Sequence, residues 1–281
     1  MNKKTYTINV GGQLMSLEKP VVMGILNVTD NSFYAASRAM SDEQIRKRAL
    51  QIVEEGASIV DLGACSTKPG AAPVSEEEEM ERLGRALEVV REAVPETIVS
   101  VDTYRARVAE RCVKEYGAHI INDISGGDMD EAMFETVAAL KVPYILMHIQ
   151  GTPETMQLNP TYDNLWCELN QYLAERINRL HLLGVNDVII DPGFGFGKTV
   201  EDNYFILNHL EDLMIHDCPL LVGVSRKSMI YKLLGTTPEG ALNGTTAVHV
   251  ISLMHGAHIL RVHDVKEAVE AVRIVEKTRE A

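Results

Sequence analysis

The sequence predicts an α/β fold, an eight-stranded parallel β/α (TIM) barrel that is preceded by an N-terminal β-hairpin. Eight short apolar runs rich in valine and isoleucine recur along the chain, each followed by an amphipathic stretch of helical length. The runs do not alternate between polar and apolar residues, which is typical of strands buried on both faces of a parallel sheet. A chain of 281 residues with 46% hydrophobic content is a usual length for such a barrel. An open, doubly wound sheet is the alternative.

The first 20 residues are expected to form the hairpin and to plug the bottom of the barrel. Residues 5–10 and 13–17 alternate in polarity, and Gly11-Gly12 between them is a turn signal. The apolar runs that follow are 21–28, 58–62, 98–101, 119–121, 144–147, 187–190, 220–224 and 258–262. The helical stretches are 42–55, 76–92, 106–116, 130–140, 162–183, 200–213, 243–254 and 266–277. Nothing in the composition marks a linker, so residues 1–281 are assigned to one domain.

Composition excludes several classes of protein. With 27 Lys and Arg against 40 Asp and Glu, the net charge is −13, which repels nucleic acid and anionic membranes. A small anionic substrate remains possible, because a few local cations can reverse the field inside a cleft. The four cysteines form no CxxC pair, which argues against a zinc site or a disulfide framework. The polar N-terminus and the lack of long apolar stretches predict a cytoplasmic protein.

Polar or charged residues follow all eight apolar runs. Active sites of β/α barrels lie at the carboxyl ends of the strands, so these residues are expected to meet at one end of the barrel. Helix caps would explain one or two of them but not all eight. In chain order they are Asn27, Asp61 with Thr67-Lys68, Asp102, Asn122-Asp123, His148, Asp191, Ser225-Arg226-Lys227-Ser228, and Arg261 with His263-Asp264.

These residues divide into two sets by charge. Asp102, Asn122 and Asp191 can hydrogen-bond the edge of a flat heterocycle that carries several N–H donors. The second set is cationic and suits a phosphate or diphosphate. Its members are Lys68, Arg226, Lys227, Arg261 and His263. Together the two sets predict a ligand that is a polar heteroaromatic ring at one end and strongly anionic at the other.

The glycine-rich stretch 191–199 matches neither common nucleotide motif. Its glycine spacing is too short for a P-loop and lacks the third glycine of a dinucleotide-binding turn. We interpret it instead as a strand-to-helix turn on which two exposed phenylalanines, Phe194 and Phe196, line an aromatic ligand. Met147 ends the fifth run, and its side chain is expected to face the same pocket.

Eight segments of the chain, in order, resemble the signatures of the dihydropteroate synthase family. They are 23–29 with Ser32-Phe33, 61–71, 100–103, 121–123, 147–157, 191–198, 225–228 and 261–264. One such segment would be weak support, but eight in the same order along nearly the whole chain are specific. The resemblance implies a barrel enzyme of folate biosynthesis, a target of sulfonamides, that joins 6-hydroxymethyl-7,8-dihydropterin diphosphate to p-aminobenzoate. It also implies a magnesium ion and a homodimer formed through outer helices late in the barrel.

The resemblance also implies a role for each matching residue. Asn27 would ligate magnesium, and Arg261 with His263 would hold the diphosphate. The residues implied to hold the pterin are Asp102, Asn122, Asp191 and Lys227. The residues implied to shape the p-aminobenzoate pocket are Phe33, Thr67, Pro69, Phe194 and Ser228, with Lys68 at the position of the usual arginine. Met147 and Gly195 complete the set expected to contact substrate. The residues given a catalytic role are Asn27, Lys227, Arg261 and His263.

The chemistry expected of this site is an SN1-like alkyl transfer. The electron-rich dihydropterin can carry positive charge on its methylene group while diphosphate leaves, and the residues include no nucleophile–base pair. The sequence departs from the family at three places: Asp30-Asn31, the stretch 34–36 that includes Ala35, and Lys68. Two alternatives therefore stay open, a corrinoid-dependent methyltransferase that shares the pterin-binding residues and a pterin-binding protein without catalysis.

Overall fold

The computed structural model describes residues 5–28, 40–65, 74–153, 155–156 and 160–281, and within them eight parallel strands form a nearly closed barrel. The strands are β3 (Val21–Asn27), β4 (Ile59–Gly63), β5 (Ile98–Asp102), β6 (Ile120–Asp123), β7 (Tyr144–Met147), β8 (Val188–Asp191), β9 (Leu221–Val222) and β10 (Ile259–Val262). Their order around the barrel is β8-β7-β6-β5-β4-β3-β10-β9. A parallel bridge between Ile190 and Leu220 joins the two ends of this row. The predicted barrel is confirmed, and the open sheet is excluded.

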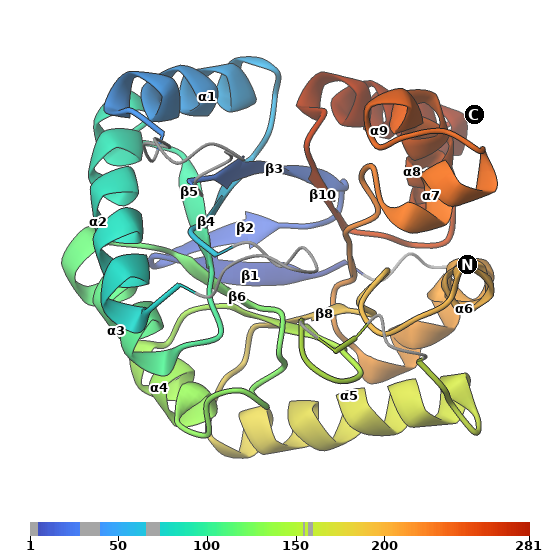
Figure 1. Cartoon of the computed structure of the whole chain (residues 1–281), viewed down its shortest axis with the longest axis horizontal. Coiled ribbons are helices and arrows are strands. Elements are labelled where there is room, and N and C mark those ends of the chain that lie inside the picture. The colour runs from blue at the N-terminus through green and yellow to red at the C-terminus, as the bar shows by residue number, and fades with distance from the viewer. Residues whose placement is uncertain (1–4, 29–39, 66–73, 154, 157–159) are drawn as a thin grey trace.

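Helices surround the strands, as Figure 1 shows. They are α1 (Asp42–Glu54), α2 (Glu76–Ala93), α3 (Ala106–Tyr116), α4 (Met133–Leu140), α5 (Leu165–Leu182), α6 (Val200–Asn208), α7 (Ser228–Leu233), α8 (Leu242–Met254) and α9 (Val265–Arg279). Two 3₁₀ segments, η1 (Leu210–His216) and η2 (Glu239–Ala241), precede β9 and α8. No helix in the described ranges is long and apolar enough to span a bilayer.

Three predicted elements are shorter or broken in the structure. The helix expected over 200–213 ends at Asn208, because the N–H of His209 bonds to the carbonyls of Phe205 and Ile206 and the chain tightens into η1. The helix expected over 130–140 begins at Met133, since the Asp130 carboxylate accepts the N–H of Ala106 at 2.7 Å and of Ala132 at 3.0 Å. β9 ends before Gly223, and the N–H of Lys227 then bonds to Val224 in a turn.

The hydrophobic core has an outer and an inner part. The outer part lies between the strands and the ring of helices and includes Val60, Leu146 and Leu260. The inner part lies at the amino-terminal end of the barrel and contains the residues one position earlier on the same strands, such as Ile59, Ile145 and Ile259, which point the other way. Because side chains alternate along a strand, each strand contributes to both parts.

The N-terminal hairpin covers the inner part of the core. It consists of β1 (Thr7–Val10) and β2 (Gln13–Ser16), which pair antiparallel. Ile8, Val10 and Leu17 are buried and pack in the same cluster as the inward-facing residues at the strand starts. The N–H of Asn9 also bonds to the Asp187 carboxylate at 3.1 Å. The hairpin plugs the barrel as predicted, and it lies across the middle of the ring in Figure 1.

Substitution Ile8→Ala is expected to lower the free energy of unfolding by about 2–5 kcal/mol, because it leaves a cavity in a closed core. Ile8 is 1% exposed, whereas Leu14 on the same hairpin is 77% exposed. Leu14→Ala is therefore the matched control and should change stability by less than about 0.5 kcal/mol. Urea unfolding followed by circular dichroism measures both values. Equal midpoints for the two variants would contradict the plug.

Candidate active site

The inward-facing side chains change from apolar to polar along the strands. On four strands, the residue two positions after an inward-facing isoleucine is polar and lies on the same inward face. These residues are Asp61 on β4, Asn122 on β6, Asp191 on β8 and Arg261 on β10. The strands are parallel, so these positions all lie at the carboxyl end of the barrel, opposite the hairpin. The sequence thus places a polar layer directly above an apolar one.

Strand register brings three predicted residues into one row. Asn27 pairs with Gly63, Gly63 with Asp102, and Asp102 with Asn122 across β3, β4, β5 and β6. Gly63 leaves space in this row, because a β-carbon there would lie 3.0 Å from Oδ1 of Asn27 and 3.7 Å from Cβ of Asp102. Asn27 is exposed at the rim, and Asn122 is buried.

Arg261 lies between two carboxylates. Its Nε donates to Asp61 at 2.6 Å, and its Nη2 donates to Asp102 at 2.7 Å. Asp61 also accepts the Nδ2 group of Asn122 at 3.3 Å. Burial raises the pKa of Asp102, an effect that the Arg261 guanidinium partly offsets and the Asp61 carboxylate increases. The cationic set and the heterocycle-binding set predicted from the sequence are therefore not separate in space, because Arg261 of the first is bound to Asp102 of the second.

Asp191 and Lys227 form the other half of the constellation. The Asp191 carboxylate accepts the N–H of Gly193 at 2.7 Å, and the Lys227 ammonium donates to the carbonyl of Phe194 at 2.6 Å. A β-carbon on Gly223 would lie 3.8 Å from both Asp191 Oδ2 and Lys227 Nζ, so both charged groups border the space left by this glycine. Burial lowers the pKa of Lys227 to about 8, while Asp191 counteracts this effect.

The remaining described residues of the predicted set lie around this centre. Met147 ends β7 and is buried in a small apolar cluster against which Phe196 packs. Gly195 has a φ of +80°, and a β-carbon there would lie 3.4 Å from Cδ of Lys227. His263 follows β10, and its Nδ1 lies 3.1 Å from Oγ of Ser225. Ser228 is the first residue of α7, whose N-terminus has no hydrogen bond from a capping side chain.

Two expectations about these loops are wrong. Phe194 was expected to be exposed beside the ligand, but its side chain is completely buried in the outer core, and only its carbonyl reaches Lys227. Arg226 was expected to bind an anion. Its guanidinium instead makes two bonds to Asp264, at 2.8 and 2.9 Å, and two more to the carbonyls of Pro238 and Glu239. Arg226 thereby fixes the loop after β9 and has little capacity left for a substrate.

Some predicted residues lie outside the described ranges. They are Phe33, Thr67, Lys68 and Pro69, together with Asp30, Asn31 and Ala35 of the departures from the family pattern. Of the residues implied for the p-aminobenzoate pocket, Phe194 and Ser228 lie within the described ranges.

The two sets drawn from the sequence omitted Asp61 and Lys198. Asp61 is a lone carboxylate within an apolar strand and shares the inward face of Ile59, a pattern that could have identified it. Lys198 is 5% exposed and lies 2.9 Å from Nδ1 of His148, a contact between segments 50 residues apart. Sequence spacing carries no signal for that contact.

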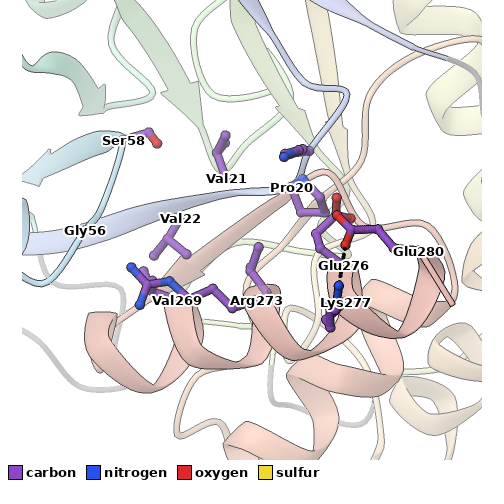
Figure 2. Close-up of a pocket in the computed structure, with 12 residues that line it drawn as sticks. Pro20, Val21, Val22, Gly56, Ser58, Val269, Arg273, Glu276, Lys277 and Glu280 are labelled. Atoms are coloured by element: carbon purple, nitrogen blue, oxygen red, sulfur yellow. Dashed lines mark hydrogen bonds and ion pairs between the residues drawn. The ribbon is translucent and has the colours of Figure 1, made fainter.

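A separate cavity of about 350 Å³ lies at the opposite end of the barrel. Figure 2 shows it between the start of β3 and α9, with Val21, Val269 and Arg273 in its wall. None of the predicted site residues lines it. The predicted site residues lie instead at the carboxyl end, where the carboxylates and the Asn122 amide lie near Lys227 and Arg261.

Comparison with known proteins agrees with this geometry. The model of the pterin-binding enzyme family matches residues 23–263, a span that runs from β3 to just beyond β10. The chain belongs to the pterin-binding enzyme family. Within that family it is similar to the dihydropteroate synthase of Escherichia coli (strain K12), with 45% identity over 272 residues, 96% of this chain and 95% of the relative. The Haemophilus influenzae dihydropteroate synthase is 37% identical over 95% of this chain and 97% of the relative.

Solved structures give the same result. The Yersinia pestis dihydropteroate synthase in a sulfonamide drug complex superposes with a TM-score of 0.92 at 42% identity, covering 98% of this chain and all of the other. The Xanthomonas albilineans dihydropteroate synthase with 4-aminobenzoic acid superposes with a TM-score of 0.89 at 36% identity, covering 99% of this chain and all of the other.

Proposed function

We propose that this chain is a dihydropteroate synthase, a transferase that condenses 6-hydroxymethyl-7,8-dihydropterin diphosphate with p-aminobenzoate and releases diphosphate. The observation that carries the proposal is the layer of Asp102, Asn122, Asp191, Lys227 and Arg261 at one end of the barrel. Relatives along the full chain support it, including the structure that contains 4-aminobenzoic acid.

The carboxylates and the amide would recognise the pterin ring. A pterin presents a 2-amino group and a ring N–H side by side, and the Asp191 carboxylate can accept both. Asn122 and Asp102 would bind the opposite edge, while Lys227 would donate to a ring acceptor near Asp191. Every one of these groups is positioned by a strand end or by a backbone contact before substrate arrives, so little ordering entropy is lost on binding.

Arg261 and His263 would stabilise the leaving group, the first by charge and the second as a hydrogen-bond donor, because burial lowers the pKa of His263 to about 4 and leaves its ring neutral near pH 7. Arg261 uses Nε and Nη2 for Asp61 and Asp102, and its Nη1 makes no hydrogen bond within the described residues. This third edge of the guanidinium and the His263 ring would bind the departing diphosphate. The first backbone N–H groups of α7, at Ser228, would bind the carboxylate of p-aminobenzoate.

Magnesium fits the residues that are present. Asn27 is exposed at the rim and offers a carboxamide oxygen, for which the missing side chain of Gly63 leaves room. Magnesium prefers oxygen ligands, retains several waters and is often held by few protein groups plus substrate phosphates. When bound with the diphosphate, it would neutralise charge on the leaving group. Among the described residues no cluster of three or more His, Cys, Asp or Glu side chains could hold a metal ion by itself.

The bond changes follow an SN1-like course in this proposal. The bond between the pterin methylene and the diphosphate oxygen breaks, and its electron pair leaves with diphosphate. The dihydropterin ring delocalises the positive charge, the aniline nitrogen of p-aminobenzoate then bonds to the methylene carbon, and a proton leaves that nitrogen. Without p-aminobenzoate, ¹⁸O in the bridging position should exchange with non-bridging positions. A lack of exchange without p-aminobenzoate, together with strictly concerted kinetics when both substrates are present, would argue for a concerted reaction.

The activity itself is tested by diphosphate release. Purified protein with magnesium, the dihydropterin diphosphate and p-aminobenzoate should release diphosphate and form 7,8-dihydropteroate, identified by its mass. A corrinoid methyltransferase would form no such product. Bound pterin without product would favour the catalytically inactive alternative.

A homodimer formed through the late helices is part of the proposal. α8 exposes Ile251 and Met254 one helical turn apart. Leu233 at the end of α7 and Leu234 directly after it are also exposed. The double substitution Ile251→Glu/Met254→Glu should convert a dimer to a monomer, because it places charge in an apolar interface. Light scattering after gel filtration measures the mass. Leu182→Glu, at an exposed site on α5, is the control and should leave the mass unchanged; a wild-type monomer would contradict the dimer.

A further inference from the structure

Lys198 is a buried lysine whose amine contacts two neighbouring segments at the carboxyl end of the barrel. Its Nζ lies 2.9 Å from Nδ1 of His148, which follows β7, and donates to the carbonyls of Gly193 and Phe196 at 3.0 Å each. The side chain is 5% exposed. Burying an ammonium group costs several kcal/mol unless hydrogen bonds compensate, so an apolar side chain would be the cheaper filler.

The turn that Lys198 holds is the one that presents two residues of the proposed pterin site. Between the carbonyls of Gly193 and Phe196 lies Phe194, whose own carbonyl binds Lys227 at 2.6 Å. The N–H of Gly193 binds the Asp191 carboxylate at 2.7 Å. Lys198 therefore fixes the backbone on both sides of the Phe194 carbonyl, which binds Lys227. It also fixes Gly193, whose N–H orients the Asp191 carboxylate.

The turn has no room to move toward β7. Gly193 has a φ of +71°, and a β-carbon on it would lie 1.9 Å from the carbonyl oxygen of His148. The backbone of His148 in turn donates its N–H to the carbonyl of Asp191 at 3.0 Å. Asn203 of α6 holds the turn on its other side, since its Oδ1 accepts the N–H of Gly195 at 2.7 Å. The position of Asp191 thus depends on a packed set of contacts in which Lys198 supplies the central donor.

We propose that Lys198 is a positioning residue for pterin recognition, which holds the turn Gly193–Phe196 so that Asp191 and Lys227 face the pterin ring. This inference rests on the proposed function, because it assigns a further residue to the same site. Its positive charge also faces Asp191, and burial lowers the pKa of Lys198 to about 7. Protonated Lys198 supports the Asp191 carboxylate, and this support is lost as pH rises through that value.

The test compares Lys198→Met with Lys198→Gln. Calorimetry with 6-hydroxymethylpterin gives Kd from pH 6.0 to 8.5, and steady-state kinetics give kcat and KM. Lys198→Met should raise Kd and the KM for pterin diphosphate about 10-fold or more at pH 6, with kcat at saturation within about 3-fold, since about 1.4 kcal/mol of lost orientation corresponds to 10-fold. Lys198→Gln should recover most of the affinity, because an amide can donate to one or both carbonyls and accept from His148.

The pH profile separates this role from simple packing. The ratio of the Lys198→Met Kd to the wild-type Kd should fall as pH rises through about 7, because the wild-type protein itself loses the charge. The other titrating or charged groups near Lys198 are Asp191, Lys227, Asp202 and His148, with Asp102 farther along the site. Because these groups are present in both proteins, the effect of their titration on Kd is similar in both and largely cancels in the ratio.

Lys114→Met, at an exposed lysine of α3, is the control and should match wild type throughout. Wild-type Kd in folded Lys198→Met, or a ratio that is constant with pH, would overturn the inference. If Lys198→Met does not fold, Lys198→Gln must still show a Kd ratio that declines with pH, and a constant ratio overturns the inference. Calorimetry needs no catalysis. If the wild-type protein bound pterin but formed no product, that result would count against the proposed function alone.

Discussion

Substitution Arg261→Met is expected to lower kcat/KM for pterin diphosphate by about 10³-fold or more. Removing one preorganised charged donor from a developing anion typically costs 10²- to 10³-fold in rate. Here the same change also removes the ion-pair partner that the Asp61 and Asp102 carboxylates share. Steady-state kinetics at several concentrations of both substrates measure the effect, most of which should appear in kcat.

The stability of Arg261→Met should depend on pH in a definite direction. Removing one partner of a buried ion pair costs about 3–5 kcal/mol when the other stays charged. Burial raises the pKa of Asp102, so this carboxyl group takes up a proton as the pH falls and then needs no cation. The loss of stability should therefore be smaller at pH 5 than at pH 8. Urea unfolding at the two pH values measures this difference.

Arg226→Met is the matched comparison for Arg261→Met. Arg226 forms an ion pair of similar exposure with Asp264, and both arginines belong to the same end of the barrel. Its loss should reduce stability, while its direct effect on catalysis is limited because its donors bind Asp264 and two loop carbonyls. If Arg261→Met kept activity within 10-fold of wild type, or if Arg226→Met lost as much activity, the assignment of the leaving-group cation would be wrong.

Substitution Asp191→Asn is expected to raise the KM for pterin diphosphate and the Kd for pterin by about 100-fold or more. The amide keeps the shape and can still accept the N–H of Gly193, but it loses the charge-assisted bonds to two pterin donors. Each such bond contributes about 1.5–3 kcal/mol. The asparagine also presents a donor toward one of the pterin N–H groups, which adds repulsion.

Asp187→Asn is the control for Asp191→Asn. Asp187 immediately precedes the same strand, β8, at its opposite end and binds the hairpin through the N–H of Asn9. This variant should bind pterin as wild type does, although it can unfold at a slightly lower temperature. Calorimetry with 6-hydroxymethylpterin measures both variants. Similar affinities for Asp191→Asn and wild type would remove Asp191 from the pterin site.

Much of the barrel could be predicted because its signal is local. Runs such as 144–147 and 220–224 lack charged residues and do not alternate in polarity, which is typical of strands buried on both faces. The strand ends then located the site, since Asp102, Asn122 and Asp191 share one end by topology alone. The hairpin followed from alternation around Gly11-Gly12.

The predictions that were wrong, and the site residues that were missed, depend on contacts between distant segments. Phe194 lies between two glycines with positive φ, and nothing in the local sequence indicates that this turn directs the ring into the core. Arg226 resembles its neighbour Lys227 in sequence, but its partner Asp264 lies 38 residues later. Asp61 and Arg261 are 200 residues apart. Pairing of side chains across a barrel depends on register and depth, which composition and spacing do not encode.

The most direct test of the central claim is product formation by wild type and Asp191→Asn, measured side by side by mass spectrometry with magnesium, dihydropterin diphosphate and p-aminobenzoate. The account predicts 7,8-dihydropteroate and an equal amount of diphosphate from wild type. It predicts the same product from Asp191→Asn only at roughly 100-fold higher pterin diphosphate, by the bond energies given above. No dihydropteroate from wild-type protein that binds pterin would contradict the account and identify the barrel as a pterin-binding protein without this activity.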